Sequence, residues 1–377
     1  MKKFLKILKM IGISIGVIVA LVVLIAALFM NLSPEFGAAP TDSQKANYAK
    51  ADNYADGKFV NEVEVNMSMS FSNGLKIMRQ FLGSDPSRQP SEPQTILSID
   101  PKEVAQNPDT LTRVNWFGHS AFLLQIDGKN LLLDPMLGPS PAPHPLLGTK
   151  RYTDELPLEI EELPTIDAVI ISHDHYDHLD YGSIAKLKDK VEEFFVPLGV
   201  GAHFKAWGVE EAHIHEKNWW DEFEFKGLTL ACTPARHFSG RGLFDRMTTL
   251  WASWVIIGQK DTIYFSGDSS YGPHFKEIGE KYGPFDFAMM ECGQYNEMWK
   301  DVHMMPEETA QAGIDVKAKL LMPIHWGAFT LALHSWTDPV ERVTAKAAEL
   351  GLPLTTPRIG EPIILGQSPY PALQWWK

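Results

Sequence analysis

A short block of histidines and aspartates has the strongest capacity for chemistry in this sequence. It reads Ser-His-Asp-His-Tyr-Asp-His over residues 172–178 and follows directly on the apolar run 168–171. Such a run is typical of a buried strand, so the block is expected at the rim where that strand ends. Residues two apart share a face of an extended segment, which predicts that His173 and His175 bind one metal ion. Asp177 and His178 lie past the expected turn and are predicted to bind a second ion.

Three more candidate ligands each follow an apolar run of their own, at 229–232, 262–265 and 320–324. These candidates are His237, Asp268 and His325. A catalytic zinc ion takes about three protein ligands and keeps one position for water, so the block at 172–178 completes neither ion alone. We therefore expect the four strand ends to converge and to complete both sites.

The seven candidates divide between the two ions. The ligands predicted for the first ion are His173, His175 and His237. The ligands predicted for the second ion are Asp177, His178 and His325. Asp268 is expected to bridge the two, because each oxygen of a carboxylate can bind a cation. Two cations about 3.5–4 Å apart share a hydroxide that is acidified toward neutral pH, so the chemistry indicated is hydrolysis.

The remaining polar and charged residues limit the other classes of function. A lone histidine is more often hydrogen-bonded than ligated, which is the expectation for His144, His203, His213, His215 and His274. Cys232 and Cys292 lie in apolar runs and are expected to be small buried side chains. The formal charge of -13 disfavours a nucleic-acid substrate, because such binding depends on Lys and Arg replacing counterions.

The N-terminus predicts a membrane anchor. Four lysines, at positions 2, 3, 6 and 9, precede an uninterrupted apolar stretch over residues 11–30. About 20 such residues cross the hydrocarbon core as a helix, and the stretch is too long for a cleavable signal peptide. The lysines predict that the N-terminal end is cytoplasmic, which makes the protein single-pass with its catalytic domain on the extracytoplasmic side.

Three parts are predicted along the chain. Residues 1–31 form the transmembrane anchor, residues 32–109 a linker and irregular extension that wraps the main domain, and residues 110–377 the catalytic domain. In the last part apolar runs alternate with helical patterns such as 181–190, which indicates a layered α/β fold. Trp251 and Trp254 are expected in a buried strand. Trp207, Trp219 and Trp220 are expected either in the core or in a lipid-facing groove.

The motifs resemble the metallo-β-lactamase superfamily, whose signature is the His-x-His-x-Asp-His block followed by distant His, Asp and His ligands. Longer stretches are similar to the N-acyl-phosphatidylethanolamine-hydrolysing phospholipase D family. These stretches are Asn-Trp-Phe-Gly-His-Ser at 115–120, the block extended over 170–181, and Met-Pro-Ile-His-Trp-Gly at 322–327. The resemblance implies a four-layered αββα sandwich with the metals at the sheet ends.

The same resemblance implies a phosphodiesterase that acts on phospholipid-like or small phosphodiester substrates through a metal-bridging hydroxide. Two divalent ions are expected, zinc first, with Mn²⁺ or Fe²⁺ as alternatives that the same ligands accept. The implied catalytic residues are Asp177, Asp268 and His303, the last as a donor to a phosphate oxygen or leaving group. A surface role at a helix entrance is the alternative for His303. The oligomeric state stays open, and a homodimer is one alternative.

Two other functions remain open at this point. A lactonase or esterase similar to the ascorbate-6-phosphate lactonases would use the same ligands, because both reactions place negative charge on the cations. A membrane-tethered metal-binding scaffold without activity is the alternative from another class. Departures from the family pattern, Gly-Asp-Ser-Ser at 267–270 and Glu-Cys-Gly-Gln-Tyr at 291–295, predict a pocket that differs from that of the family.

Overall fold

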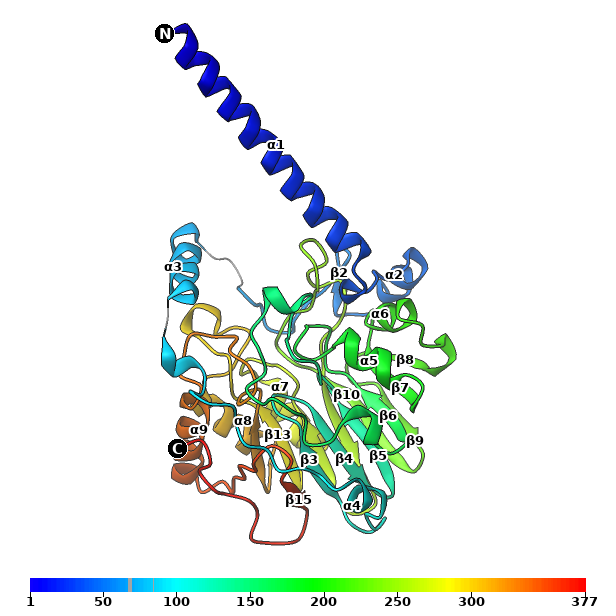
Figure 1. Cartoon of the computed structure of the whole chain (residues 1–377). Coiled ribbons are helices and arrows are strands. Elements are labelled where there is room, and N and C mark those ends of the chain that lie inside the picture. Colours follow the sequence, from blue (N-terminus) through cyan, green and yellow to red (C-terminus); the bar gives the residue numbers. More distant parts are fainter. Residues whose placement is uncertain (67–69, 84) are drawn as a thin grey trace.

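Two mixed β-sheets lie face to face in the computed structural model, which describes residues 1–66, 70–83 and 85–377 (Figure 1). The first sheet, in spatial order, contains β15 (Pro362–Ile364), β3 (Arg113–Trp116), β4 (Phe122–Ile126), β5 (Lys129–Leu133), β6 (Ile166–Ile170), β7 (Val191–Pro197) and β8 (Ile214–Lys217). The second contains β14 (Leu321–Ile324), β13 (Phe287–Glu291), β12 (Thr262–Phe265), β11 (Ser253–Ile257), β10 (Leu228–Thr233) and β9 (Glu222–Phe225). Strands β5 to β8 run parallel, as do β12 to β14.

Helices cover the outer face of each sheet. Those on the first sheet are α4 (Pro101–Ala105), α5 (Tyr181–Leu187) and α6 (Gly201–Ala206). Those on the second are α7 (His274–Lys281), α8 (Pro306–Asp315) and α9 (Asp338–Leu350). The short 3-10 helices are η1 (Pro34–Phe36), η2 (Pro86–Arg88), η3 (Pro145–Leu147), η4 (Ile160–Glu162), η5 (Glu211–His213) and η6 (Glu297–Trp299). The layers are therefore helix, sheet, sheet and helix, which confirms the predicted αββα sandwich.

Burial on both faces explains why the central strands are mostly apolar. In β5, Leu131 and Leu133 point between the sheets, whereas Leu132 packs under the helices of the first sheet. In β13, Met289 points between the sheets and Met290 packs under the helices of the second. Side chains alternate between faces, so a strand buried on both faces has no polar side to show.

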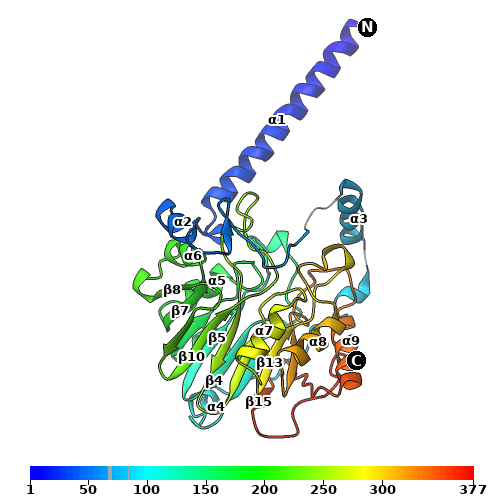
Figure 2. The same cartoon turned by 180° about the vertical axis from the view of Figure 1, so that it is seen from behind.

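Helix α1 (Lys2–Leu32) projects away from the body (Figures 1 and 2). It has a mean hydropathy of 3.1 over its most apolar window, and none of its residues is buried. Its 31 residues extend about 46 Å, which exceeds the roughly 30 Å hydrocarbon core of a bilayer. The predicted apolar helix is confirmed as a candidate membrane span.

The segment between α1 and the sandwich contains more regular structure than its composition predicts. It includes α2 (Asp42–Tyr48), the hairpin β1 (Tyr54–Ala55) and β2 (Lys58–Phe59), and α3 (Phe71–Leu82). A capping box between Thr41 and Gln44 begins α2. Tyr48 and Phe59 are buried in the core between the sheets, so this segment is packed onto the body.

Candidate metal centre

The topology brings the candidate ligands to one edge of the sandwich. Asp268 follows β12 and His325 follows β14, and these strands lie on either side of β13 in a parallel set. The block at 172–178 follows β6 of the facing sheet, and His237 follows β10. Parallel strands end at the same edge, so residues distant in sequence become neighbours. All seven predicted ligands lie in groups whose nitrogen and oxygen atoms are within 4.8 Å of one another.

The first group contains three histidines whose ring nitrogens converge. His175 Nδ1 lies 2.8 Å from His173 Nε2 and 3.2 Å from His237 Nε2. The other ring nitrogen of two of these histidines has a hydrogen-bond partner. His237 Nδ1 donates to the Val302 carbonyl at 2.8 Å, and His173 Nδ1 lies 2.9 Å from the Ser172 hydroxyl. A proton on Nδ1 leaves a lone pair on Nε2, so these lone pairs point at a common space that suits a cation.

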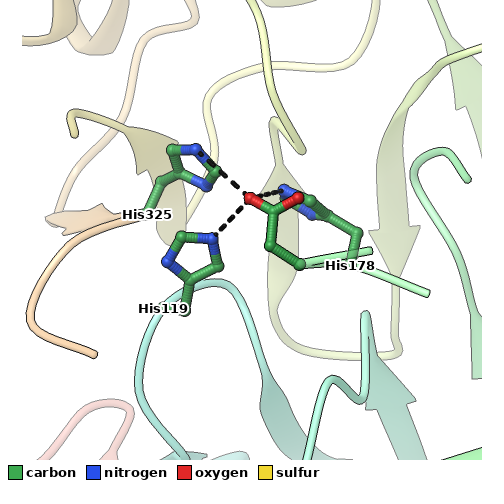
Figure 3. Close-up of side chains that lie close together, drawn as sticks. His119, His178 and His325 are labelled. Atoms are coloured by element: carbon green, nitrogen blue, oxygen red, sulfur yellow. Dashed lines mark hydrogen bonds and ion pairs between the residues drawn. The ribbon is translucent and has the colours of Figure 1, made fainter. Parts of the chain in front are cut away.

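The second group surrounds the carboxylate of Asp177, and its three histidines are drawn in Figure 3. Asp177 Oδ2 lies 2.9 Å from His119 Nε2, 3.6 Å from His178 Nε2 and 3.8 Å from His325 Nε2. His119 was not among the predicted ligands. It occupies a turn after β3 with φ 56°, and its place in the Asn-Trp-Phe-Gly-His-Ser stretch at 115–120 was the signal that could have indicated it.

Asp268 lies between the two groups with one oxygen facing each. Its Oδ1 is 3.2 Å from His178 Nε2 and 3.0 Å from His325 Nδ1. Its Oδ2 is 3.9 Å from His173 Nε2 and 3.7 Å from His237 Nε2. This is the arrangement that a bridging carboxylate requires.

Burial sets the charge of these groups. It lowers the pKa of His173, His237 and His325 well below the ordinary value, and it lowers the pKa of His175 to about 4. The neutral imidazole is the form that binds metal. His178 differs: burial opposes its charge, but Asp268 and Asp177 raise its pKa well above the ordinary value.

The donor set suits a bound cation. Within the described part of the chain, His178 Nε2, Asp268 Oδ1 and His119 Nδ1 are buried and have no hydrogen-bond partner. Orphaned buried polar atoms are costly, and the first two face each other across 3.2 Å. A cation between them would satisfy both atoms.

Asp134 holds His178 in place. Its Oδ2 accepts a 2.7 Å hydrogen bond from His178 Nδ1, and its Oδ1 accepts one from the Ser172 amide. Asp134 directly follows β5, the parallel neighbour of β6, and sequence reasoning missed it although it follows an apolar run. The substitution Asp134→Asn is expected to weaken metal binding about 10- to 100-fold, because carboxylates behind ligating histidines make contributions of this size.

Competition with a chromophoric chelator would measure this loss. The matched control is Asp167→Asn, which changes an aspartate of the same β6 region that pairs with Lys226 instead of a histidine. Equal affinities for Asp134→Asn and the unmodified protein would contradict the supporting role.

A cavity of about 300 Å³ opens over the candidate metal centre. It is lined by ligand candidates, by the apolar side chains Phe238, Met298, Trp299, Val302 and Leu331, by Arg246, and by the polar side chains Asn66, Gln294 and Asp301. His303 also lines it and lies with Asp268 and His325 in a third group of close ligand atoms. His303 Nδ1 contacts the fully buried Glu291 at 3.0 Å, which leaves Nε2 as the nitrogen available to the cavity.

For Trp207 and Trp219 the structure bears out the core alternative. Trp207 and Trp219 are buried and donate their indole N–H groups to the carbonyls of Pro34 and Trp251, so neither lines the cavity. Trp299, which sequence reasoning did not single out, lines it instead. Trp251 and Trp254 are fully buried, as predicted.

The five histidines expected to be ordinary lie outside the groups of close ligand atoms. His203 contacts Asp174 at 3.2 Å, His213 and His215 contact Glu193, and His144 accepts the Leu146 amide. His274 lies 3.0 Å from the Ser269 hydroxyl and is buried. Burial lowers the pKa of His274 to about 3.

His274 predicts a pH dependence of stability. Its folded pKa lies below the unfolded value of about 6.5, so only the unfolded state takes up a proton between these values and stability falls as the pH falls. The group is expected to lower the free energy of unfolding by about 2 kcal/mol between pH 8 and pH 5. Urea unfolding at both pH values would measure this change in the free energy of unfolding. In His274→Gln the change should be smaller by this amount than in the unmodified protein. An unchanged difference in that variant would contradict the prediction.

Comparison with known proteins agrees with this geometry. A family model described as a beta-lactamase superfamily domain matches residues 129–326, which is more than half of the 377 residues. The chain belongs to the metallo-β-lactamase superfamily. It is a metal-dependent hydrolase of that superfamily, so the coarser part of the predicted function is confirmed. The number and identity of the metal ions remain predictions.

Three similar proteins illustrate this membership. An uncharacterized protein of Mycobacterium tuberculosis is 38% identical over 344 residues, which cover 90% of this metallo-β-lactamase-superfamily chain and 91% of that protein. The N-acyl-phosphatidylethanolamine-hydrolyzing phospholipase D 1 of Caenorhabditis elegans is 35% identical over 57% of this chain and 64% of its own length. The structure of Igni18, a metallo hydrolase from Ignicoccus hospitalis, matches 69% of this chain and 100% of its own with a TM-score of 0.52 and 22% identity, which bears on the fold alone.

Proposed function

We propose that this chain is a binuclear metal-dependent phosphodiesterase of the phospholipase D type. The observation that most supports this proposal is the position of Asp268, whose two carboxylate oxygens face two separate groups of histidines. When bound there, two divalent cations would acidify a water molecule and withdraw charge from the phosphate oxygens. We assign the first cation to His173, His175 and His237, and the second to Asp177, His178 and His325, with His119 as an additional candidate. Zinc is the first expectation.

The chain's own residues have distinct tasks in this proposal. Ser172, Asp134 and the Val302 carbonyl fix the tautomers of the ligating rings. Asp177 and Asp268 bring negative charge that balances the cations. His303, held by Glu291, is placed to give a proton to the departing alkoxide at the cavity wall.

The cavity supports a phospholipid-like substrate over a small polar one. Its wall combines the Arg246 guanidinium with the apolar side chains of Phe238 and Met298. A cation with planar donors suits a phosphate, and apolar walls suit acyl chains. The name of the similar Caenorhabditis elegans enzyme, which hydrolyses N-acyl-phosphatidylethanolamine, points to the same class.

The location of the reaction is part of the proposal. We propose that residues 1–31 anchor the chain in a membrane and that residues 110–377 form the catalytic domain on the extracytoplasmic side. The lysines before the apolar stretch support this orientation, since positive charge is retained on the cytoplasmic side. A reporter enzyme that works only outside the cytoplasm should be active when it is fused to the C-terminus. A reporter that works only in the cytoplasm should be inactive at the same position.

A turnover screen tests the reaction itself. The full chain in detergent-lipid micelles, loaded with zinc, would be incubated with a total phospholipid extract and with simple lactones, and products would be read by mass spectrometry. The expected products are phosphatidic acids and free head groups. Turnover of lactones alone would replace the phosphodiesterase by a lactonase, and binding of two metals without any turnover would favour a scaffold.

A further inference from the structure

The end of the candidate membrane span is joined directly to the metal-binding edge. Arg241, which is only 4% exposed, donates from Nε to the Glu35 carbonyl at 2.8 Å. The same guanidinium donates from Nη1 to the carbonyls of Asp174 and Leu179 at 2.6 and 2.7 Å. Glu35 lies three residues after α1, and Asp174 lies within the histidine block. The edge that carries the metal centre is therefore the edge from which α1 projects (Figure 1).

Two loops at this edge carry exposed apolar tips. In η3, Leu146 is 88% exposed and Leu147 is 68% exposed. The neighbouring His144 ring lies 6.3 Å from the ring of Phe29 in the last turns of α1. In the loop 238–247, which rises beside the lower end of α1 in Figures 1 and 2, Leu243 is 72% exposed and Phe244 is 91% exposed. Exposed apolar side chains that gather on one side of a protein are typical of sites that contact a membrane or a partner.

The loop 238–247 connects this surface to the cavity. Phe238 and Arg246, at its two ends, line the cavity, and the guanidinium of Arg246 lies 4.6 Å from the Phe238 ring. The Asp245 carboxylate accepts hydrogen bonds from the amides of Gly242 and Arg241, which shapes the turn that carries the exposed tip. One loop thus forms both a wall of the cavity and an apolar projection toward the membrane.

Helix α3 adds a third element on the same side of the body (Figures 1 and 2). Phe71, Met78 and Phe81 share one face of this helix and are 90%, 51% and 44% exposed. Its polar face carries Lys76 and Arg79, and the helix contains no acidic residue. An amphipathic helix with basic polar residues is typical of segments that lie in the interface of a bilayer.

We propose that η3, the tip of the loop 238–247 and α3 form one surface that inserts into the leaflet from which α1 emerges. The occupant is a phospholipid surface, whose acyl chains receive the exposed apolar side chains and whose phosphates pair with the basic face of α3. The cavity mouth then faces the leaflet, and a lipid reaches the metal centre without crossing water. This inference depends on α1 as a membrane span and not on which bond the protein breaks.

Site-directed fluorescence tests this surface without any turnover. The full chain with Phe244→Cys would be labelled with an environment-sensitive dye and inserted into nanodiscs of phosphatidylcholine and phosphatidylglycerol. The two native cysteines are buried and 0% exposed, so the new thiol is the one that reacts. The matched control is Lys102→Cys in α4, which is exposed and lies at the opposite end of the body in both views.

Lipids with a nitroxide on the upper acyl chain are expected to quench the dye at position 244 about threefold more than the dye at position 102. Aqueous iodide should show the reverse order. Equal quenching at both positions would overturn the proposal. A dye at position 244 that is protected from both quenchers would also overturn it, because a protein partner would then cover this surface.

Discussion

Replacement of Asp268 by Asn is expected to lower turnover on the order of 10³-fold, which is the largest loss we expect from a single isosteric change. The amide keeps the size of the side chain but offers one weak oxygen ligand in place of two charged ones. In the structure each carboxylate oxygen faces a separate group of histidines, so one group loses its share of the bridge. The bound metal is expected to fall from two ions to about one.

Elemental analysis and turnover of the same preparation would measure both effects. The matched control is Asp261→Asn, a buried aspartate just before the other end of β12 that accepts a hydrogen bond from Thr112 at 2.6 Å. An amide oxygen can still accept that bond, so this variant should retain its metal and its activity. Full activity in Asp268→Asn would contradict the bridging role.

Replacement of His303 by Asn is expected to lower kcat about 10²- to 10³-fold on a substrate with an alkoxide leaving group. The reason is that Nε2 faces the cavity while Nδ1 is held by Glu291 at 3.0 Å. Burial lowers the pKa of His303 and raises that of Glu291 well above its ordinary value. KM and metal content should change little, since His303 is not among the predicted ligands.

The leaving group provides the internal test of this role. A p-nitrophenolate departs without protonation, so His303→Asn should lose little activity on bis-p-nitrophenyl phosphate. Glu291→Gln should cause a smaller loss on the alkyl substrate and shift the pH profile, because Glu291 positions the ring. His213→Asn at the surface serves as the control. Equal losses of His303→Asn on both substrates would show that it does not protonate the leaving group.

The candidate site was predictable where a buried strand runs straight into a ligand. The block after β6, Asp268 after β12 and His325 after β14 all follow this pattern, and the structure brings them together. His119 and Asp134 follow strands as well, but each is a single polar residue in a turn. Only the pairing of β3 with β4 and of β5 with β6 shows that these turns meet at the metal centre. Which strands are neighbours depends on contacts distant in sequence, and periodicity carries no information about them.

The fold class was predictable for a related reason, whereas the helices and the hairpin of the extension were not. Strands that are apolar on both faces require cover on both sides, which favours layers of helices around sheets. The extension has few apolar residues, so its composition indicates a linker. Two of its aromatic residues, Tyr48 and Phe59, enter a core built by strands far along the chain. Likewise, Arg241 links the segment after α1 to the metal-binding edge only when that segment packs against the body, which the sequence does not indicate.

The contacts after α1 bear on how a soluble form of the protein should be prepared. Trp207 Nε1 donates to Pro34, Arg241 donates to Glu35, and the amide of Ala38 donates to His203 Nδ1. Gly37 has φ 66°, and a side chain at this position would collide with His203. A version that starts at residue 33 keeps these contacts, whereas one that starts at residue 41 removes one hydrogen-bond partner from each of three buried side chains. Proteolytic cleavage after Ala38 would release a body that lacks these stabilising contacts at its metal-binding edge.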